Sequence, residues 1–181
     1  MPSKNATNFQ ILQRYVDYLN TILNQTITDS RLTVINRGEH LIVTRYQNKN
    51  FLPLELDPPS FLHFKQLAFV NSKGKVVVED CRYLYSMSDN IDDEDKWIFR
   101  YEYNLKPDKN VPHAHIHLNG YCNNICIKHI HFPTGRVSIE QIIAHLILEH
   151  KIIPKQPGWF ETLSDSHKGF LQRRNDPPMF P

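Results

Sequence analysis

The spacing of apolar residues predicts helices on either side of a run of strands. In residues 9–25 apolar side chains recur every three or four positions, the period that gives a helix one apolar face. Residues 138–150 repeat this pattern, with Ser138 and Gln141 spaced as in a capping box. A third, short helix is expected at 161–171. Each of the two longer helices is expected to bury one face.

Between these helices the pattern changes to alternation, which predicts strands. Residues 71–74 form the turn of the clearest hairpin, and Pro53, Pro58 and Pro59 mark a loop. We expect two strands within 31–46, joined at Gly38, and others at 61–70, 75–87, 97–103, 113–118 and 125–132. This order predicts an α+β fold, an antiparallel sheet with helices packed on one face.

A chain of 181 residues is long enough to bury a proper core in one domain. We expect a single α+β domain over residues 1–155, with its N-terminal helix at 9–25. Residues 156–181 are expected to be a C-terminal tail, with a short helix followed by an extended, proline-rich end.

Composition narrows the function classes only slightly. The formal charge of +2 is too small to indicate a nucleic-acid-binding protein by itself. Three cysteines fit no disulfide framework, and the first residues do not resemble a signal peptide. Apolar stretches are too short to span a membrane. We therefore expect a cytoplasmic protein with no membrane partner.

Histidines are concentrated in one short segment. Five of the ten lie within 19 residues, far more than random scatter would place there. Alternate residues of a strand point to the same face, so a strand over 113–118 carries three of them on one face. The five are His113, His115, His117, His129 and His131.

The register between the two predicted strands decides whether these histidines meet. A five-residue loop at 120–124 pairs His115 with His129 and His113 with His131, so that all five share one face. A two-residue turn shifts the pairing by one residue. His129 and His131 then point to the face opposite to His113, His115 and His117. We expect a shared face.

Three kinds of chemistry suit such a face. Two imidazoles can act as general base and general acid, which is one way to cleave RNA without a metal. Two or three imidazoles can instead bind zinc or another divalent metal, with His113, His115, His129 and His131 as candidate ligands. The histidines can also be polar residues of a solvated face. The sequence thus leaves the cofactor as none or an unknown divalent metal.

Cations near the histidines are candidates for binding a phosphate-bearing substrate. Arg100 and Lys128 lie on or beside the predicted strands. Thr134 and Arg136 precede the helix start at Ser138, where free backbone N–H groups can hold an anion, although an ordinary capped turn also fits.

Aromatic residues alternate along the predicted sheet. Core packing accounts for most of them, and stacking on nucleic-acid bases is the alternative. They are Tyr83, Tyr85, Trp97, Phe99, Tyr101 and Tyr103.

About 70–90 central residues resemble the TumE family, toxin components of bacterial toxin–antitoxin pairs. The resemblance follows Leu62 to Val70, Glu79 to Tyr85, Ile98-Phe99-Arg100-Tyr101 and Pro112-His113-Ala114-His115. It implies an α+β fold, a toxin role and a DNA-binding antitoxin as partner, with Arg100, His113 and His115 as site residues. This chain departs from the family pattern in its longer N-terminal part, its second His-x-His and its tail.

These observations lead to one main hypothesis and two alternatives. The main one is a toxin-like or defence-related protein, a ribonuclease-like hydrolase that acts on RNA or another phosphate-bearing substrate by histidine acid/base chemistry. The first alternative is a metal-binding histidine cluster. The second is a non-catalytic subunit of a larger defence assembly, docked through the aromatic sheet or the tail around Trp159.

Overall fold

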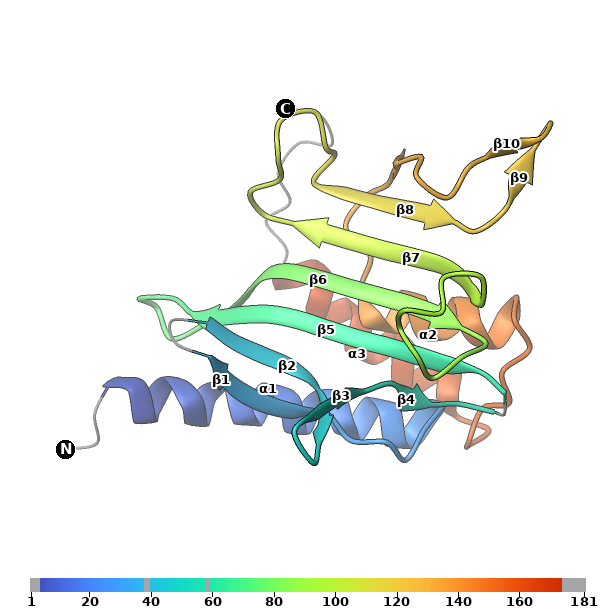
Figure 1. The fold of residues 1–181 in the computed structure, drawn as a ribbon. Coiled ribbons are helices and arrows are strands. Elements are labelled where there is room, and N and C mark those ends of the chain that lie inside the picture. Colours follow the sequence, from blue (N-terminus) through green and yellow to red (C-terminus); the bar gives the residue numbers. More distant parts are fainter. Residues whose placement is uncertain (1–3, 38–39, 58, 174–181) are drawn as a thin grey trace.

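The computed structural model describes residues 4–37, 40–57 and 59–173, which form a sheet and three helices (Figure 1). All strand pairs are antiparallel, as expected for an α+β fold. The helices are α1 (Lys4–Thr26), α2 (Ile139–Leu148) and α3 (Trp159–Arg173). The strands are β1 (Thr33–Arg37), β2 (His40–Gln47), β3 (Asn50–Leu52), β4 (Leu54–Glu55), β5 (Phe61–Val70), β6 (Val76–Ser86), β7 (Trp97–Asn104), β8 (Ala114–Leu118), β9 (Tyr121–Cys122), β10 (Ile125–Cys126) and β11 (Phe132–Pro133).

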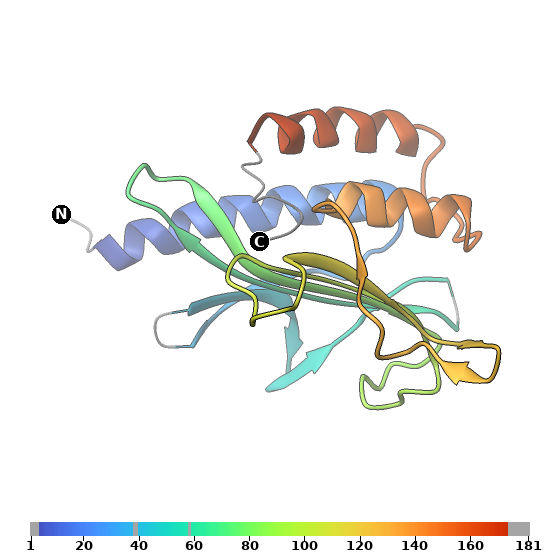
Figure 2. The ribbon, with the colours of Figure 1, turned by 90° about the horizontal axis from the view of Figure 1, so that it is seen from above.

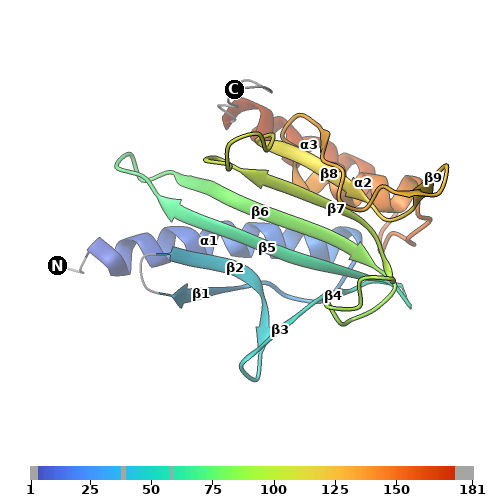
Figure 3. The same ribbon diagram turned by 45° about the horizontal axis from the view of Figure 1, so that its top comes forward.

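The main sheet has the order β1-β2-β5-β6-β7-β8-β11, with β3 beside β2 and β4 beside β5. Figure 2 shows all three helices on one side of this sheet. We call the covered side the inner face and the opposite side the outer face, which Figure 3 turns toward the reader with the helices behind. The expected arrangement of helices on one face is confirmed.

The alternation predicted for the strands explains which residues form the core. In β7, Phe99, Tyr101 and Tyr103 are buried, whereas Arg100 and Glu102 between them are not. The buried rings belong to the same core as the apolar residues of α1 and α2. The aromatic side chains of the inner face are therefore covered by helices and are not free to stack on nucleic-acid bases.

Helix α3 packs against α1 and α2 in the helical layer. Leu163 is 4 % exposed, and Ser166 is hydrogen-bonded to Tyr18 of α1 and to Glu140 of α2. The proline-rich end expected after this helix lies outside the described residues. Among those that are described, no helix is long and apolar enough to cross a membrane.

The single strand expected at 125–132 is wrong. Asn123 and Asn124 both have positive φ, of 48° and 64°, which is typical of a two-residue hairpin turn. The turn joins β9 to β10, a separate two-stranded sheet. The chain returns to the main sheet only at β11, where Phe132 pairs with Ile116 and Pro133 with His115.

The start of α2 matches the capping box expected from the sequence. Ser138 Oγ accepts a hydrogen bond from the Gln141 N–H at 3.2 Å, and the Gln141 side chain accepts one from the Ser138 N–H at 3.0 Å. Replacing Ser138 with alanine is expected to lower the free energy of unfolding by about 1 kcal/mol, because a helix N–H loses its acceptor. Chemical denaturation checks this, with Ser138→Thr as the control that keeps a hydroxyl. Equal stability of Ser138→Ala and the parent chain would contradict it.

Candidate metal centre

Cross-strand pairing gathers charged and imidazole side chains on the outer face. Glu102 of β7 pairs with Arg82 of β6 and with His115 of β8, and Arg100 pairs with His117. Directly paired residues of an antiparallel sheet point to the same face. Because Tyr101 and Tyr103 point to the inner face, Arg100 and Glu102 point outward together with the two histidines.

The segment that follows β8 covers these histidines and adds a third. Continuing the β8–β11 register by one residue places His131 opposite His117. The imidazole centroids of His115, His117 and His131 lie 4.5–5.0 Å from one another. Each ring offers a nitrogen, and these nitrogens lie within 4.8 Å of one another. We call these three residues the histidine triad.

The tautomer of His117 leaves one ring nitrogen without a partner. Its Nδ1 lies 3.1 Å from the carbonyl oxygen of Lys128, and a carbonyl only accepts hydrogen bonds, so Nδ1 carries the proton. Nε2 is then a lone-pair acceptor in the neutral ring. This nitrogen is buried and has no hydrogen-bond partner among the described residues, while the whole residue is 2 % exposed.

The ring of His115 also contacts a backbone carbonyl, and its other nitrogen lies next to a carboxylate. Its Nδ1 lies 3.1 Å from the Pro112 carbonyl oxygen, a contact that is satisfied when Nδ1 carries a proton. Its Nε2 lies 3.2 Å from Oε2 of Glu102, and the corresponding distance from His117 Nε2 is 3.6 Å. Both ring nitrogens of His115 thus face acceptor oxygens, and a neutral ring in either tautomer turns one lone pair toward an oxygen, which is repulsive. A positive charge, either a proton or a metal ion, is needed where these atoms converge.

Glu102 is a permanent anion at neutral pH. Burial alone would raise its pKa, but the facing imidazoles of His115 and His117 and the charges of Arg82 and Arg100 hold the pKa far below its usual range. The two arginines approach its other oxygen, Oε1, with their Nε atoms at 2.7 Å and 3.1 Å. Its Oε2 therefore remains directed at the triad.

His131 forms the exposed side of the triad. It is solvent-exposed, whereas His115 and His117 are buried. Partial burial, together with the neighbouring imidazoles of His115 and His117, lowers the pKa of His131. The ring is therefore neutral at pH 7 and can donate a lone pair to a metal ion.

Two of the five histidines expected at the site do not join the triad. His113 Nδ1 lies 3.0 Å from the carbonyl oxygen of Asn104, at the far end of the β7–β8 pair. His129 is solvent-exposed and lies in the segment between β10 and β11. The expected shared face is thus found for His131 with His115 and His117, but the expected pairs His115–His129 and His113–His131 are wrong.

The cations expected near the histidines divide between the two faces. Arg100 and Lys128 both lie 5.6 Å from the ring centroid of Trp97, on the side of the triad. Lys128 is also paired with Glu94, in the segment between β6 and β7, at 2.6 Å. Arg100 is thus held next to the triad through Glu102, whereas the charge of Lys128 is already balanced.

Thr134 and Arg136 lie toward the inner face instead. The Thr134 N–H donates to the Ala114 carbonyl, and its Oγ1 is buried without a partner among the described residues. The guanidinium of Arg136 lies 4.5 Å from the ring centroid of Tyr103. The sheet therefore separates Arg136 from the triad, so the two cannot act on the same group.

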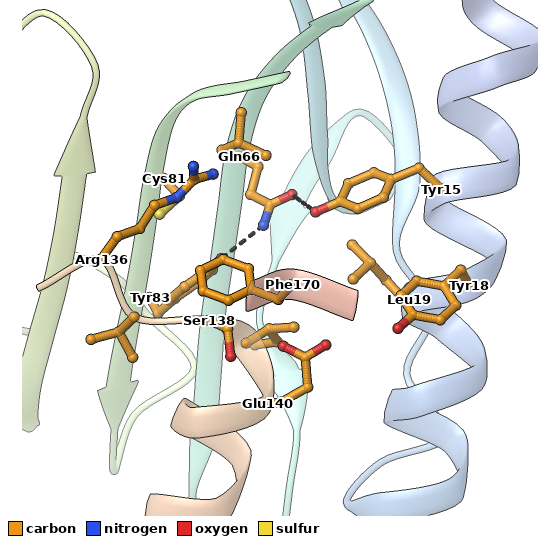
Figure 4. A pocket seen from close by; sticks show the side chains of 13 residues that line it. Tyr15, Tyr18, Leu19, Gln66, Cys81, Tyr83, Arg136, Ser138, Glu140 and Phe170 are labelled. Carbon is orange, nitrogen blue, oxygen red and sulfur yellow. Dashed lines mark hydrogen bonds between the residues drawn. The ribbon is translucent and has the colours of Figure 1, made fainter. Parts of the chain in front are cut away.

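Arg136 lines a small cavity between the inner face and the helices (Figure 4). Three of the polar side chains in this cavity, Tyr15, Gln66 and Tyr83, bind one another. Tyr15 donates to Gln66 at 2.9 Å, and Gln66 donates to Tyr83 at 2.7 Å, as the dashed lines mark. Because these buried groups already have partners, we interpret the cavity as a structural network that joins α1 to the sheet.

Sequence reasoning missed Glu102 and Arg82. Glu102 stands two residues after Arg100, so alternation alone placed it on the same face as Arg100. Nothing in the local sequence indicates that Arg82 lies beside it, because that contact depends on the β6–β7 register.

Comparison with protein families, with curated proteins and with solved structures finds no match for this chain. The resemblance to the TumE family, and the antitoxin partner that it implies, therefore have no support beyond the quoted motifs and stay predictions.

Proposed function

We propose that this protein binds one divalent transition metal ion, zinc in the first place, at the histidine triad, and uses it in hydrolysis. The observation that carries the proposal is the convergence of ring nitrogens. His115 and His117 have their Nδ1 atoms next to backbone carbonyls, and their Nε2 atoms face the same carboxylate oxygen. Metal-binding histidines commonly hold their other N–H in this way.

A metal ion satisfies more of these atoms than protons do. One imidazolium proton would relieve the contact of His115 with Glu102 but would leave His117 Nε2 unpaired. A second imidazolium would place like charges next to each other, with Arg100 close by. A single dication held by the three rings would accept a lone pair from each of them and would be balanced by the anion of Glu102.

Three protein ligands favour a catalytic site over a closed structural one. Catalytic zinc commonly has three protein ligands and keeps its fourth position for water or substrate. The exposed side of the triad at His131 provides a path for both. Zinc held there would supply a water of lowered pKa, and Glu102, whose Oε2 faces the triad, would accept a hydrogen bond from it.

The metal-free alternative is acid/base cleavage of RNA by the same histidines. The exposed and neutral His131 next to Arg100 supports a general base with a phosphate-binding cation. The two proposals predict different rates of hydrolysis after the metal is removed with a chelator. Hydrolysis that persists at full rate after chelation would favour acid/base chemistry over a metal.

Metal analysis of protein purified without a polyhistidine tag tests the proposal. We expect one zinc per chain after loading and dialysis, and less than a tenth of that in His115→Ala and His131→Ala. His129→Ala is the matched control, since this exposed histidine lies outside the triad, and it should retain the full stoichiometry. Equal zinc content in all four proteins would overturn the proposal, because the binding would then be independent of the triad.

A further inference from the structure

A row of charged residues on the outer face leads across the sheet to the triad. Lys65 of β5 pairs with Arg82 of β6, Arg82 pairs with Glu102 of β7, and Glu102 pairs with His115 of β8. Neighbouring strands are about 4.8 Å apart, so Arg82 is separated from His115 by about 10 Å of sheet. Arg100 stands in the adjacent row, opposite His117.

The arginines keep most of their hydrogen-bond donors free. Each Nε lies in an ion-pair contact with the same oxygen of Glu102, and no hydrogen bond of either guanidinium is found among the described residues. The Arg82 side chain is 48 % exposed. A guanidinium has five N–H donors arranged to bind two oxygens of one phosphate. Lys65 is exposed and forms no salt bridge in the part of the chain that the structure describes, although its charge acts to lower the pKa of Asp80.

The charge balance of this face calls for an anion. Glu94 is paired with Lys128, and Glu102 and Asp80 are further carboxylates of this face. Against them stand Lys65, Arg82 and Arg100. A dication at the triad would add two more positive charges, so a substrate that neutralises the site must itself be negatively charged.

We infer that Arg82 and Arg100, extended by Lys65, bind the phosphate group of a phosphate ester whose ester bond is hydrolysed at the triad. This inference rests on the proposed function and names its substrate class. In the reaction, water adds its oxygen to phosphorus and the P–O bond to the alcohol breaks. The alcohol oxygen leaves with a proton from that water, which gives inorganic phosphate and a free alcohol. The arginines hold the charge of the phosphate oxygens while the new bond forms.

Inorganic phosphate is the probe for the binding step. By calorimetry, the zinc-loaded protein is expected to bind phosphate at least about tenfold more tightly than Arg82→Ala, since one charged pair of hydrogen bonds is lost. Lys65→Ala, which leaves Glu102 untouched, should weaken binding by a smaller factor. Lys73→Ala is the matched control, an exposed cation in the β5–β6 turn, and should bind phosphate like the parent chain.

Zinc content is measured on the same samples to keep the two proposals apart. Full zinc with unchanged phosphate affinity in Arg82→Ala and Lys65→Ala would overturn the phosphate site and leave the metal proposal intact. Absence of zinc in the parent chain would overturn the metal proposal. In that case, titration of the metal-free protein with phosphate would still test whether Arg82 and Arg100 bind phosphate. Acetate that competes as well as phosphate would overturn the substrate class.

Hydrolysis gives a second readout. The zinc-loaded protein is expected to hydrolyse p-nitrophenyl phosphate, with a raised KM in Lys65→Ala and little change in kcat. Hydrolysis of p-nitrophenyl acetate at a comparable or higher rate, unaffected by Lys65→Ala, would contradict the inference, because the neutral ester has no phosphate for the cations to bind.

Discussion

Zinc at a hundred times its dissociation constant is expected to stabilise the folded chain by about 2.7 kcal/mol, and His117→Ala is expected to remove this gain. The size follows from mass action for a ligand that binds only the folded state. His117 is the strongest test because its Nε2 is buried and lacks a partner, so its loss leaves no alternative donor in that position. The measurement is urea denaturation with and without zinc.

The matched control is His113→Ala, which removes an imidazole two residues before His115. His113 precedes β8 on the outer face, but its ring is engaged by the Asn104 carbonyl, away from the triad. His113→Ala should therefore keep the full zinc-dependent gain. If zinc stabilises His117→Ala as much as it stabilises the parent chain, the triad is not where the ion binds.

Truncation of Leu146 to alanine is expected to lower the free energy of unfolding by about 2–5 kcal/mol, the range for a large apolar side chain removed from a packed core. Leu146 of α2 is 0 % exposed and belongs to the core between the helices and the inner face. Leu148, two residues later on the same helix, is 50 % exposed. Leu148→Ala removes the same atoms and should change stability by less than about 0.5 kcal/mol.

These two values are compared by chemical denaturation under identical conditions. A similar, small loss in both variants would contradict the burial of this face of α2. Because the triad is on the opposite side of the sheet, zinc stoichiometry should be unchanged in Leu148→Ala. It should also be unchanged in Leu146→Ala below its denaturation midpoint.

The sequence pattern correctly predicted those elements that are specified by residues close to one another in the chain. The capping box at Ser138 and Gln141 marks the start of α2 correctly, since the helix and its cap depend on neighbours only. The turn at 71–74 lies between β5 and β6 for the same reason. The strand expected at 125–132 failed because two asparagines can adopt positive φ and reverse the chain, which the apolar pattern on either side does not reveal.

The sequence indicated which segment carries the candidate site. The pairing of strands that are far apart in the chain determines which side chains meet there. The concentration of histidines between 113 and 131 indicated the segment that contributes the three residues of the triad. Which of them meet depends on the β8–β11 register, and this register brings His131 to His117 and leaves His129 outside. Glu102 and Arg82 join them through the pairing of β6, β7 and β8.

By itself the sequence determined the α+β class, the helices, the alternation that separates the two faces of each strand, and the segment that carries the imidazoles. Those features arise from backbone periodicity and from interactions between near neighbours. The tertiary structure alone decided which histidine nitrogens converge, which carboxylate they face and which cations share their side of the sheet. Each of these depends on a register between strands far apart in the chain, and a shift of one residue would turn every one of these side chains to the other face.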